Sequence, residues 1–157
     1  MDLLKTFSLK PHPGPRESWG RKSELLLSGK STGKSIPGLV LEAQYRCASG
    51  YLFVTSWDCG DDSLDVIFAD KDLRVLDRKS IGAMYDSTWL ESHEVVSGNQ
   101  VLLHCDNDFL IRVTVDGGLF LHQKYGELLD FIPYPSDESA IERRKRKPWW
   151  RLWQSGR

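Results

Sequence analysis

Apolar and polar side chains alternate with a period of two along most of the chain from Leu39 onward. Residues 39–46, 64–69 and 109–115 carry an apolar side chain at every second position, which is typical of antiparallel strands with one face on a core. Residues 51–57 are apolar at both alternating positions, so this strand is expected to be buried on both faces. In the first run, one face is predicted to hold Leu39, Leu41, Ala43 and Tyr45. The residues expected in the core are Phe53, Trp57, Val66, Phe68, Ile111 and Val113.

Clusters of turn-forming residues separate these runs. Asp116-Gly117-Gly118 is the strongest hairpin signal, because Asp-Gly readily supplies the positive φ angles of a type I′ turn. Further turns are predicted near residues 48–50, 60–62, 70–72, 97–99 and 106–108. Such dense turns between short strands indicate an antiparallel meander of about eight to ten strands.

The chain also contains a weak internal repeat. Residues 49–58 resemble residues 97–106 at an offset of 48, and each segment is followed by an acidic turn, a strand, a tight turn and another strand. The repeat predicts two units of three to four strands, comparable with two blades of a β-propeller. Two blades do not close a propeller, so the units would pack face to face as a sandwich or open barrel, or the chain would oligomerise. We favour the two-layer arrangement; the alternative is that similar turns recur by chance in any meander.

The flanking segments differ from this β region. Residues 8–38 are rich in Pro, Gly, Ser and Lys, so residues 1–38 are predicted to form an irregular lead-in with one short strand at residues 24–27. Residues 39–132 form the predicted antiparallel β domain. Residues 133–157 form a C-terminal tail, in which Ser136 as N-cap and Pro148 as a stop predict a short helix. The fold class is therefore mainly β, with a short C-terminal helix.

Charge is distributed unevenly between the body and the tail. The whole chain has 21 Lys/Arg and 22 Asp/Glu, a net charge of −1. Residues 142–157 hold seven Lys/Arg against one Glu, so the tail carries +6 and residues 1–141 carry −7. Such asymmetry favours contact with an oppositely charged surface. The tail residues expected to make that contact are Arg143, Arg144, Lys145, Arg146, Lys147, Trp149, Trp150, Arg151 and Trp153.

Several partners fit a basic, tryptophan-rich tail. It could fold back on the acidic body, where Trp rings would dock on the sheet and cations would pair with carboxylates. It could bind an anionic membrane surface, since Trp favours the interface and cations are attracted to anionic lipid. It could bind nucleic acid, with cations on phosphates and Trp stacked on bases. Another protein, including a second copy of the chain, is the remaining alternative.

Two segments suggest ligand sites. Residues 29–35 look like a phosphate-binding loop, but only three residues separate Gly29 from Gly33 and a strand follows, so nucleotide binding is not expected. Four acidic residues crowd one turn at a spacing that matches no known calcium loop. We interpret them as a solvated acidic hairpin that can serve as a patch for a protein partner: Asp58, Asp61, Asp62 and Asp65.

No motif indicates catalysis, and no metal or cofactor is expected. His104 and Cys105 are adjacent, but neighbours on a strand point to opposite faces and would not form a catalytic pair. A site assembled from distant residues stays open, because such sites are recognised by geometry rather than by spacing.

The sequence therefore predicts a small, non-catalytic cytoplasmic protein that works through protein–protein interaction. The absence of a long apolar run or a secretory signal in this sequence, and the unpaired spacing of Cys47, Cys59 and Cys105, favour the cytoplasm. These cysteines are expected to act as small core hydrophobes. One concrete version is a bacterial immunity or inhibitor protein whose acidic face covers a basic partner. The alternatives are a peripheral binder of anionic membrane or nucleic acid through the tail, and an enzyme with an unrecognised site.

Overall fold

A computed structural model of the chain describes residues 1–15, 18–57, 63–82, 88–106, 108–125 and 130–133. Within these ranges the fold is mainly β, every paired strand is antiparallel, and no helix is present. The predicted C-terminal helix falls outside the described residues. No helix that could cross a bilayer occurs in the part of the chain that is described.

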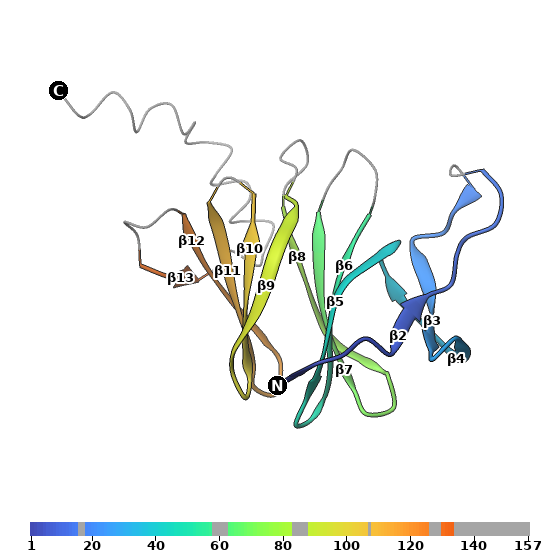
Figure 1. The fold of residues 1–157 in the computed structure, drawn as a ribbon, viewed down its shortest axis with the longest axis horizontal. Helices are drawn as coiled ribbons and strands as arrows, with labels where there is room; N and C mark the ends of the chain where they lie inside the picture. The colour runs from blue at the N-terminus through green and yellow to red at the C-terminus, as the bar shows by residue number, and fades with distance from the viewer. Residues whose placement is uncertain (16–17, 58–62, 83–87, 107, 126–129, 134–157) are drawn as a thin grey trace.

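The strands form three sheets, which Figure 1 shows as successive layers. The N-terminal sheet has the order β2-β3-β4, with bounds Phe7–Leu9, Lys22–Leu27 and Lys30–Pro37. The central sheet has the order β1-β5-β6-β7-β8, with bounds Asp2–Leu3, Val40–Cys47, Gly50–Ser56, Leu64–Asp70 and Val75–Ile81. The C-terminal sheet has the order β13-β12-β11-β10-β9, with bounds Ile132–Pro133, Leu119–Tyr125, Phe109–Val115, Gln100–Cys105 and Leu90–Ser97.

The two predicted units are confirmed as two four-stranded meanders, β5–β8 and β9–β12, that pack face to face and do not close into a barrel. The larger core lies between them and draws side chains such as Leu52 and Phe68 from one sheet, and Leu103 and Ile111 from the other. A smaller core, which includes Phe7, Leu25 and Phe53, lies between the central and N-terminal sheets. Strands β6 and β7 of the central sheet are therefore buried on both faces, as predicted for residues 51–57.

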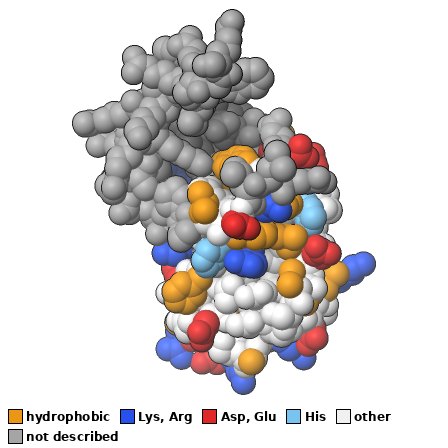
Figure 2. Space-filling view, turned by 90° about the vertical axis from the view of Figure 1, so that its left-hand side faces the viewer, with side chains coloured by type: hydrophobic (Ala, Val, Ile, Leu, Met, Phe, Trp, Pro, Cys, Tyr) orange, Lys and Arg blue, Asp and Glu red, His pale blue; other side chains and the backbone are white. Residues whose placement is uncertain are grey.

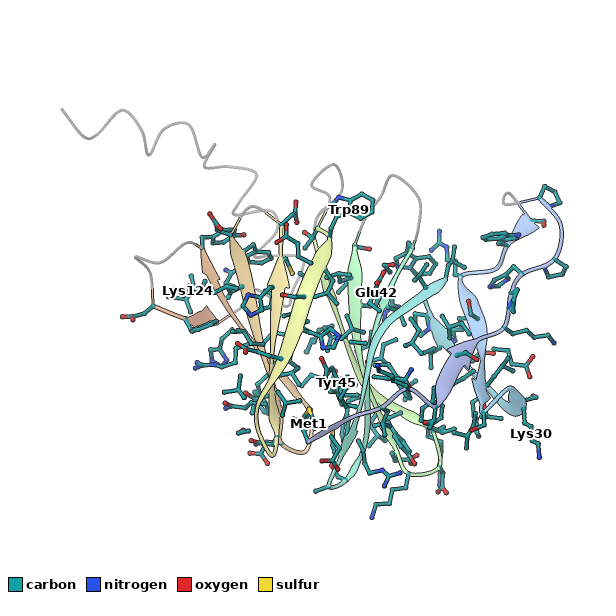
Figure 3. The ribbon with its side chains drawn as sticks, viewed as in Figure 1. Met1, Lys30, Glu42, Tyr45, Trp89 and Lys124 are labelled. Atoms are coloured by element: carbon teal, nitrogen blue, oxygen red, sulfur yellow. The ribbon has the colours of Figure 1, made fainter. Side chains whose placement is uncertain are left out.

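A contact between Tyr45 and His93 links the two meanders. The Tyr45 hydroxyl lies 2.6 Å from Nδ1 of His93, and the two rings meet edge to face at 5.6 Å. These residues are 48 positions apart, which equals the repeat offset. Figure 3 shows Tyr45 between the central and C-terminal sheets. Burial raises the pKa of Tyr45 far above its usual value and lowers the pKa of His93.

The N-terminal segment has more structure than the sequence predicted. One strand was expected, whereas β2, β3 and β4 form a sheet and β1 pairs with β5. The prediction was wrong because β4 is mostly polar and exposed, so its sequence carries no period-two signal. The side chain of Gln44 anchors this sheet: its Oε1 accepts a hydrogen bond from the Phe7 amide at 2.8 Å, and its Nε2 donates to the Phe7 carbonyl at 2.9 Å.

Two expectations about faces also need correction. A bulge between Leu41 and Ala43 shifts the register of β5, so Leu41 packs toward the N-terminal sheet while Ala43 and Tyr45 face the larger core. Trp57 is only partly buried, because it lies just beyond the end of β6. The other residues predicted for the core are fully buried or nearly so: Phe53, Val66, Phe68, Ile111 and Val113.

Candidate functional site: the outer face of the C-terminal sheet

The C-terminal sheet has one face in the larger core and one face turned away from it. Alternate residues of β10, β11 and β12 are buried in that core, including Leu103, Ile111 and Leu121. The residues between them form the outer face, which we define as Gln100, Leu102, His104, Leu110, Arg112, Thr114, Phe120, His122 and Lys124. Figure 2 views the molecule from this side and shows hydrophobic side chains gathered with Lys or Arg and His.

The repeat relates this outer face to a face of the central sheet that is covered. In the central sheet, three cross-strand pairs between β6 and β7 face the larger core: Leu52 with Phe68, Val54 with Val66, and Ser56 with Leu64. The corresponding pairs between β10 and β11 are Gln100 with Thr114, Leu102 with Arg112, and His104 with Leu110. In the first of these outer-face pairs both apolar side chains are replaced by polar ones, and in the second Arg112 stands where the central sheet has Val66. In the third pair the leucine is kept, and His104 stands where the central sheet has Ser56.

Arg112 and His122 lie directly opposite each other on β11 and β12, and both are half-buried. Nε of Arg112 and Nδ1 of His122 are buried, and neither has a hydrogen-bond partner among the described residues. The Phe131 ring stacks against Arg112, with the guanidinium carbon 4.5 Å from the ring centroid. Lys124 lies 6.0 Å from the same ring. Buried donors without acceptors are rare in folded proteins, so this pair has unused binding capacity.

A shallow hollow of about 340 Å³ opens beside this pair. Its lining residues are Gln100, Arg112, Thr114, Asp116, Phe120 and His122. Phe120 is 53% exposed, so its ring offers apolar area at the surface. The hollow therefore combines an apolar wall, two basic side chains and one carboxylate.

At the other end of the face, His104 is half-buried and its Nε2 lies 3.4 Å from a carboxylate oxygen of Glu94. Cys105, the next residue, is buried in the larger core, so the prediction that these neighbours point apart is confirmed. Burial and nearby carboxylates raise the pKa of the Cys105 thiol to about 12, and burial raises that of Cys47 to about 11. Both thiols therefore stay protonated and act as core hydrophobes, as predicted; Cys59 lies outside the described residues.

One residue of the predicted acidic patch, Asp65, does not lie at the surface. Asp65 is fully buried and cannot take part in a surface contact. Its carboxylate accepts two hydrogen bonds from the Arg78 guanidinium at 3.1 and 2.8 Å, one from the Ser80 hydroxyl at 2.5 Å and one from the Trp57 indole at 3.1 Å. The prediction was wrong for Asp65 because its ion-pair partner, Arg78, lies on the neighbouring strand β8, and the local sequence around Asp65 does not show that pairing. Asp58, Asp61 and Asp62 lie outside the described residues.

Of the remaining predicted sites, one lies among the described residues and one lies outside them. The segment that resembles a phosphate loop is the β3–β4 turn followed by β4 itself, so no helix follows it, as expected. All the predicted tail residues lie outside the described part of the chain: Arg143, Arg144, Lys145, Arg146, Lys147, Trp149, Trp150, Arg151 and Trp153. Among the described residues, no group of three or more His, Cys, Asp or Glu is placed to hold a metal ion.

Sequence reasoning missed Arg112 and His122. The signal was present in part, because Leu110, Arg112 and Thr114 occupy the positions between the buried residues of β11. It did not show that His122 faces Arg112, since that depends on the register of two strands. Comparison with protein-family models, curated proteins and solved structures finds no match to this chain.

Proposed function

We propose that the protein is a non-catalytic protein-binding module whose contact surface is the outer face of the C-terminal sheet. The observation that carries the proposal is the mixture on that face of one exposed aromatic ring and half-buried leucines with half-buried cations. Protein interfaces are enriched in aromatic residues and Arg, which together supply buried area and directed hydrogen bonds. Phe120, Leu110 and Arg112 would supply these features here.

The geometry of the repeat supports the same surface. The equivalent face of the central sheet is covered by the C-terminal meander, so the backbone of β10–β12 presents a shape on which another protein layer can pack. Because obligate interfaces are more hydrophobic, the polar side chains on the outer face favour a transient complex. An inhibitor-type or immunity-type role in the bacterial cytoplasm remains within this proposal, but its partner would be acidic rather than basic.

A matched pair of variants tests the proposed surface. Phe120→Glu places a charge on the outer face, and Leu76→Glu places one on β8, where Leu76 is 58% exposed. Partners would be captured from source-cell extract by the full chain, cross-linked and identified. We expect a partner that Phe120→Glu loses and Leu76→Glu retains, with both variants folded by circular dichroism. Equal capture by both variants would contradict the proposal.

An anionic membrane or nucleic acid is the alternative partner. The observation that favours it is that Arg112 and Lys124 on the outer face have the same sign of charge as the +6 tail. Vesicles with and without anionic lipid, and a single-stranded oligonucleotide, test this reading directly. Binding that falls steeply with salt and disappears when residues 143–147 are changed to Gln would support it.

A further inference from the structure

Among the described residues, Arg112 has neither an ion-pair partner nor an acceptor for its Nε–H. No carboxylate of the described residues lies within ion-pair distance of its guanidinium, although Arg74 and Arg78 both pair with aspartates. Its packing contact is with the Phe131 ring, which holds the guanidinium plane without neutralising it. A half-buried guanidinium in this state has a strong electrostatic preference for an incoming anion.

We infer that Arg112 and His122 form a recognition site for a carboxylate from an acidic segment of the partner protein; this inference rests on the proposed function. A guanidinium binds a carboxylate through two parallel hydrogen bonds, and Nε is one of the donors in that arrangement. Nδ1 of His122 can donate a further hydrogen bond in one tautomer, or when the ring is protonated. Both buried nitrogens would then have the acceptor that the described residues do not supply.

The other groups at the hollow favour a carboxylate on a peptide over a phosphate. Asp116 lines the same hollow, and its negative charge opposes a doubly charged phosphate more than a singly charged carboxylate. Thr114 and Gln100 supply neutral hydrogen-bonding groups, while Phe120 supplies an apolar wall for side-chain methylenes. Lys124 lies two residues along β12 from His122, on the same face, and would attract a second acidic residue of the same segment.

Titration of the full-length, isotope-labelled protein with a capped peptide of alternating Gly and Glu tests the site. We expect saturable NMR shifts at Arg112 Nε–H and at the His122 ring. Arg112→Gln should weaken binding by about tenfold or more, as for the loss of one charge-assisted pair. Arg46→Gln removes the same charge from an exposed position on β5 and should change affinity by less than about twofold. Asp116→Asn should tighten binding.

The results that overturn the inference are distinct. Peptide shifts confined to other residues, or equal losses in Arg112→Gln and Arg46→Gln, would show that charge alone attracts the peptide. Tighter binding of inorganic phosphate, anionic vesicles or an oligonucleotide at the same two resonances would show that the site is not for a carboxylate. If wild-type resonances do not respond to the peptide while Phe120→Glu still abolishes partner capture, this inference fails and the proposed function survives. If the peptide binds at Arg112 but Phe120→Glu does not affect partner capture, the carboxylate site survives and the proposed contact surface fails.

Discussion

The central meander, β5–β8, and the C-terminal meander, β9–β12, share a topology but differ in what covers them. Strands β6 and β7 of the central meander are buried on both faces, one against the N-terminal sheet and one against the C-terminal meander, whereas the edge strand β8 is mostly exposed. The C-terminal meander is buried on one face, and its other face carries cations at positions where the central meander has apolar side chains. The difference shows that a few cross-strand pairs decide whether a sheet face becomes core or surface, while the backbone pairing stays the same.

The largest effect on the free energy of unfolding should come from truncating a side chain in the larger core. Phe68 is buried in the larger core, so Phe68→Ala should lower the free energy of unfolding by about 3–5 kcal/mol. Thr114 occupies the corresponding outer-face position, and Thr114→Ala should cost less than about 0.5 kcal/mol. Urea unfolding of both variants gives the two values. Similar losses would mean that the two faces are equally covered.

The buried carboxylate of the central meander should give the next largest effect. Asp65→Ala leaves Arg78 without its partner and should cost about 2–3 kcal/mol, somewhat less than for a fully buried pair because Arg78 is 43% exposed. Asp72→Ala removes the exposed partner of Arg74 and serves as the control, with no measurable change expected. If Asp65→Ala is as mild as the control, the network around Asp65 does not stabilise the central sheet.

The contact between the meanders should make stability depend on pH. Burial lowers the pKa of His93 in the folded protein below the ordinary value of 6.5, so the unfolded chain binds a proton more readily. The contribution of neutral His93 to the free energy of unfolding is fully present above about pH 7. It is lost as pH falls through 6.5 toward the lower folded value.

Denaturant unfolding at pH 7.5 and pH 5.5 measures this loss, and His93→Gln should reduce it. Lys5 and Glu42 line the same hollow as His93 and are unchanged in that comparison. A pH dependence that is the same in His93→Gln would assign it to other groups.

The smallest effect on stability is expected from the tail. Changing residues 143–147 to Gln should alter the free energy of unfolding by less than about 1 kcal/mol, because exposed ion pairs contribute little and are screened by salt. The fluorescence of Trp149, Trp150 and Trp153 adds a second readout once Trp19, Trp57 and Trp89 are changed to Phe. Emission that is blue-shifted in the free protein would indicate fold-back on the body. Red emission that shifts only with vesicles or oligonucleotide would indicate surface binding.

The sequence predicted those parts of the fold that depend on local periodicity. Alternation located β5, β6, β7 and β11 and placed the residues Phe53, Val66, Phe68, Ile111 and Val113 in the core, because a strand repeats its faces every two residues. The polar strand β4 and the bulge at Leu41 were not predictable in this way, since neither follows the period.

The candidate site was less predictable than the fold. Arg112 and His122 are ten positions apart, and only the β11–β12 register puts them side by side. Asp65 was misplaced for the same reason, because Arg78 reaches it from a neighbouring strand. The local sequence shows which charged side chains a segment carries, whereas strand register decides which of these side chains lie next to one another.

Thiol labelling at two equivalent positions tests the central claim most directly, which is that the described strands cover this sheet face in one meander and leave it open in the other. Val54→Cys and Leu102→Cys would be made in a Cys59→Ser background, in which Cys47 and Cys105 remain buried. A thiol-reactive reagent should modify Cys at position 102 in the native protein and reach position 54 only at the rate of unfolding. Equal protection at both positions would show that the outer face is already covered and would contradict the account.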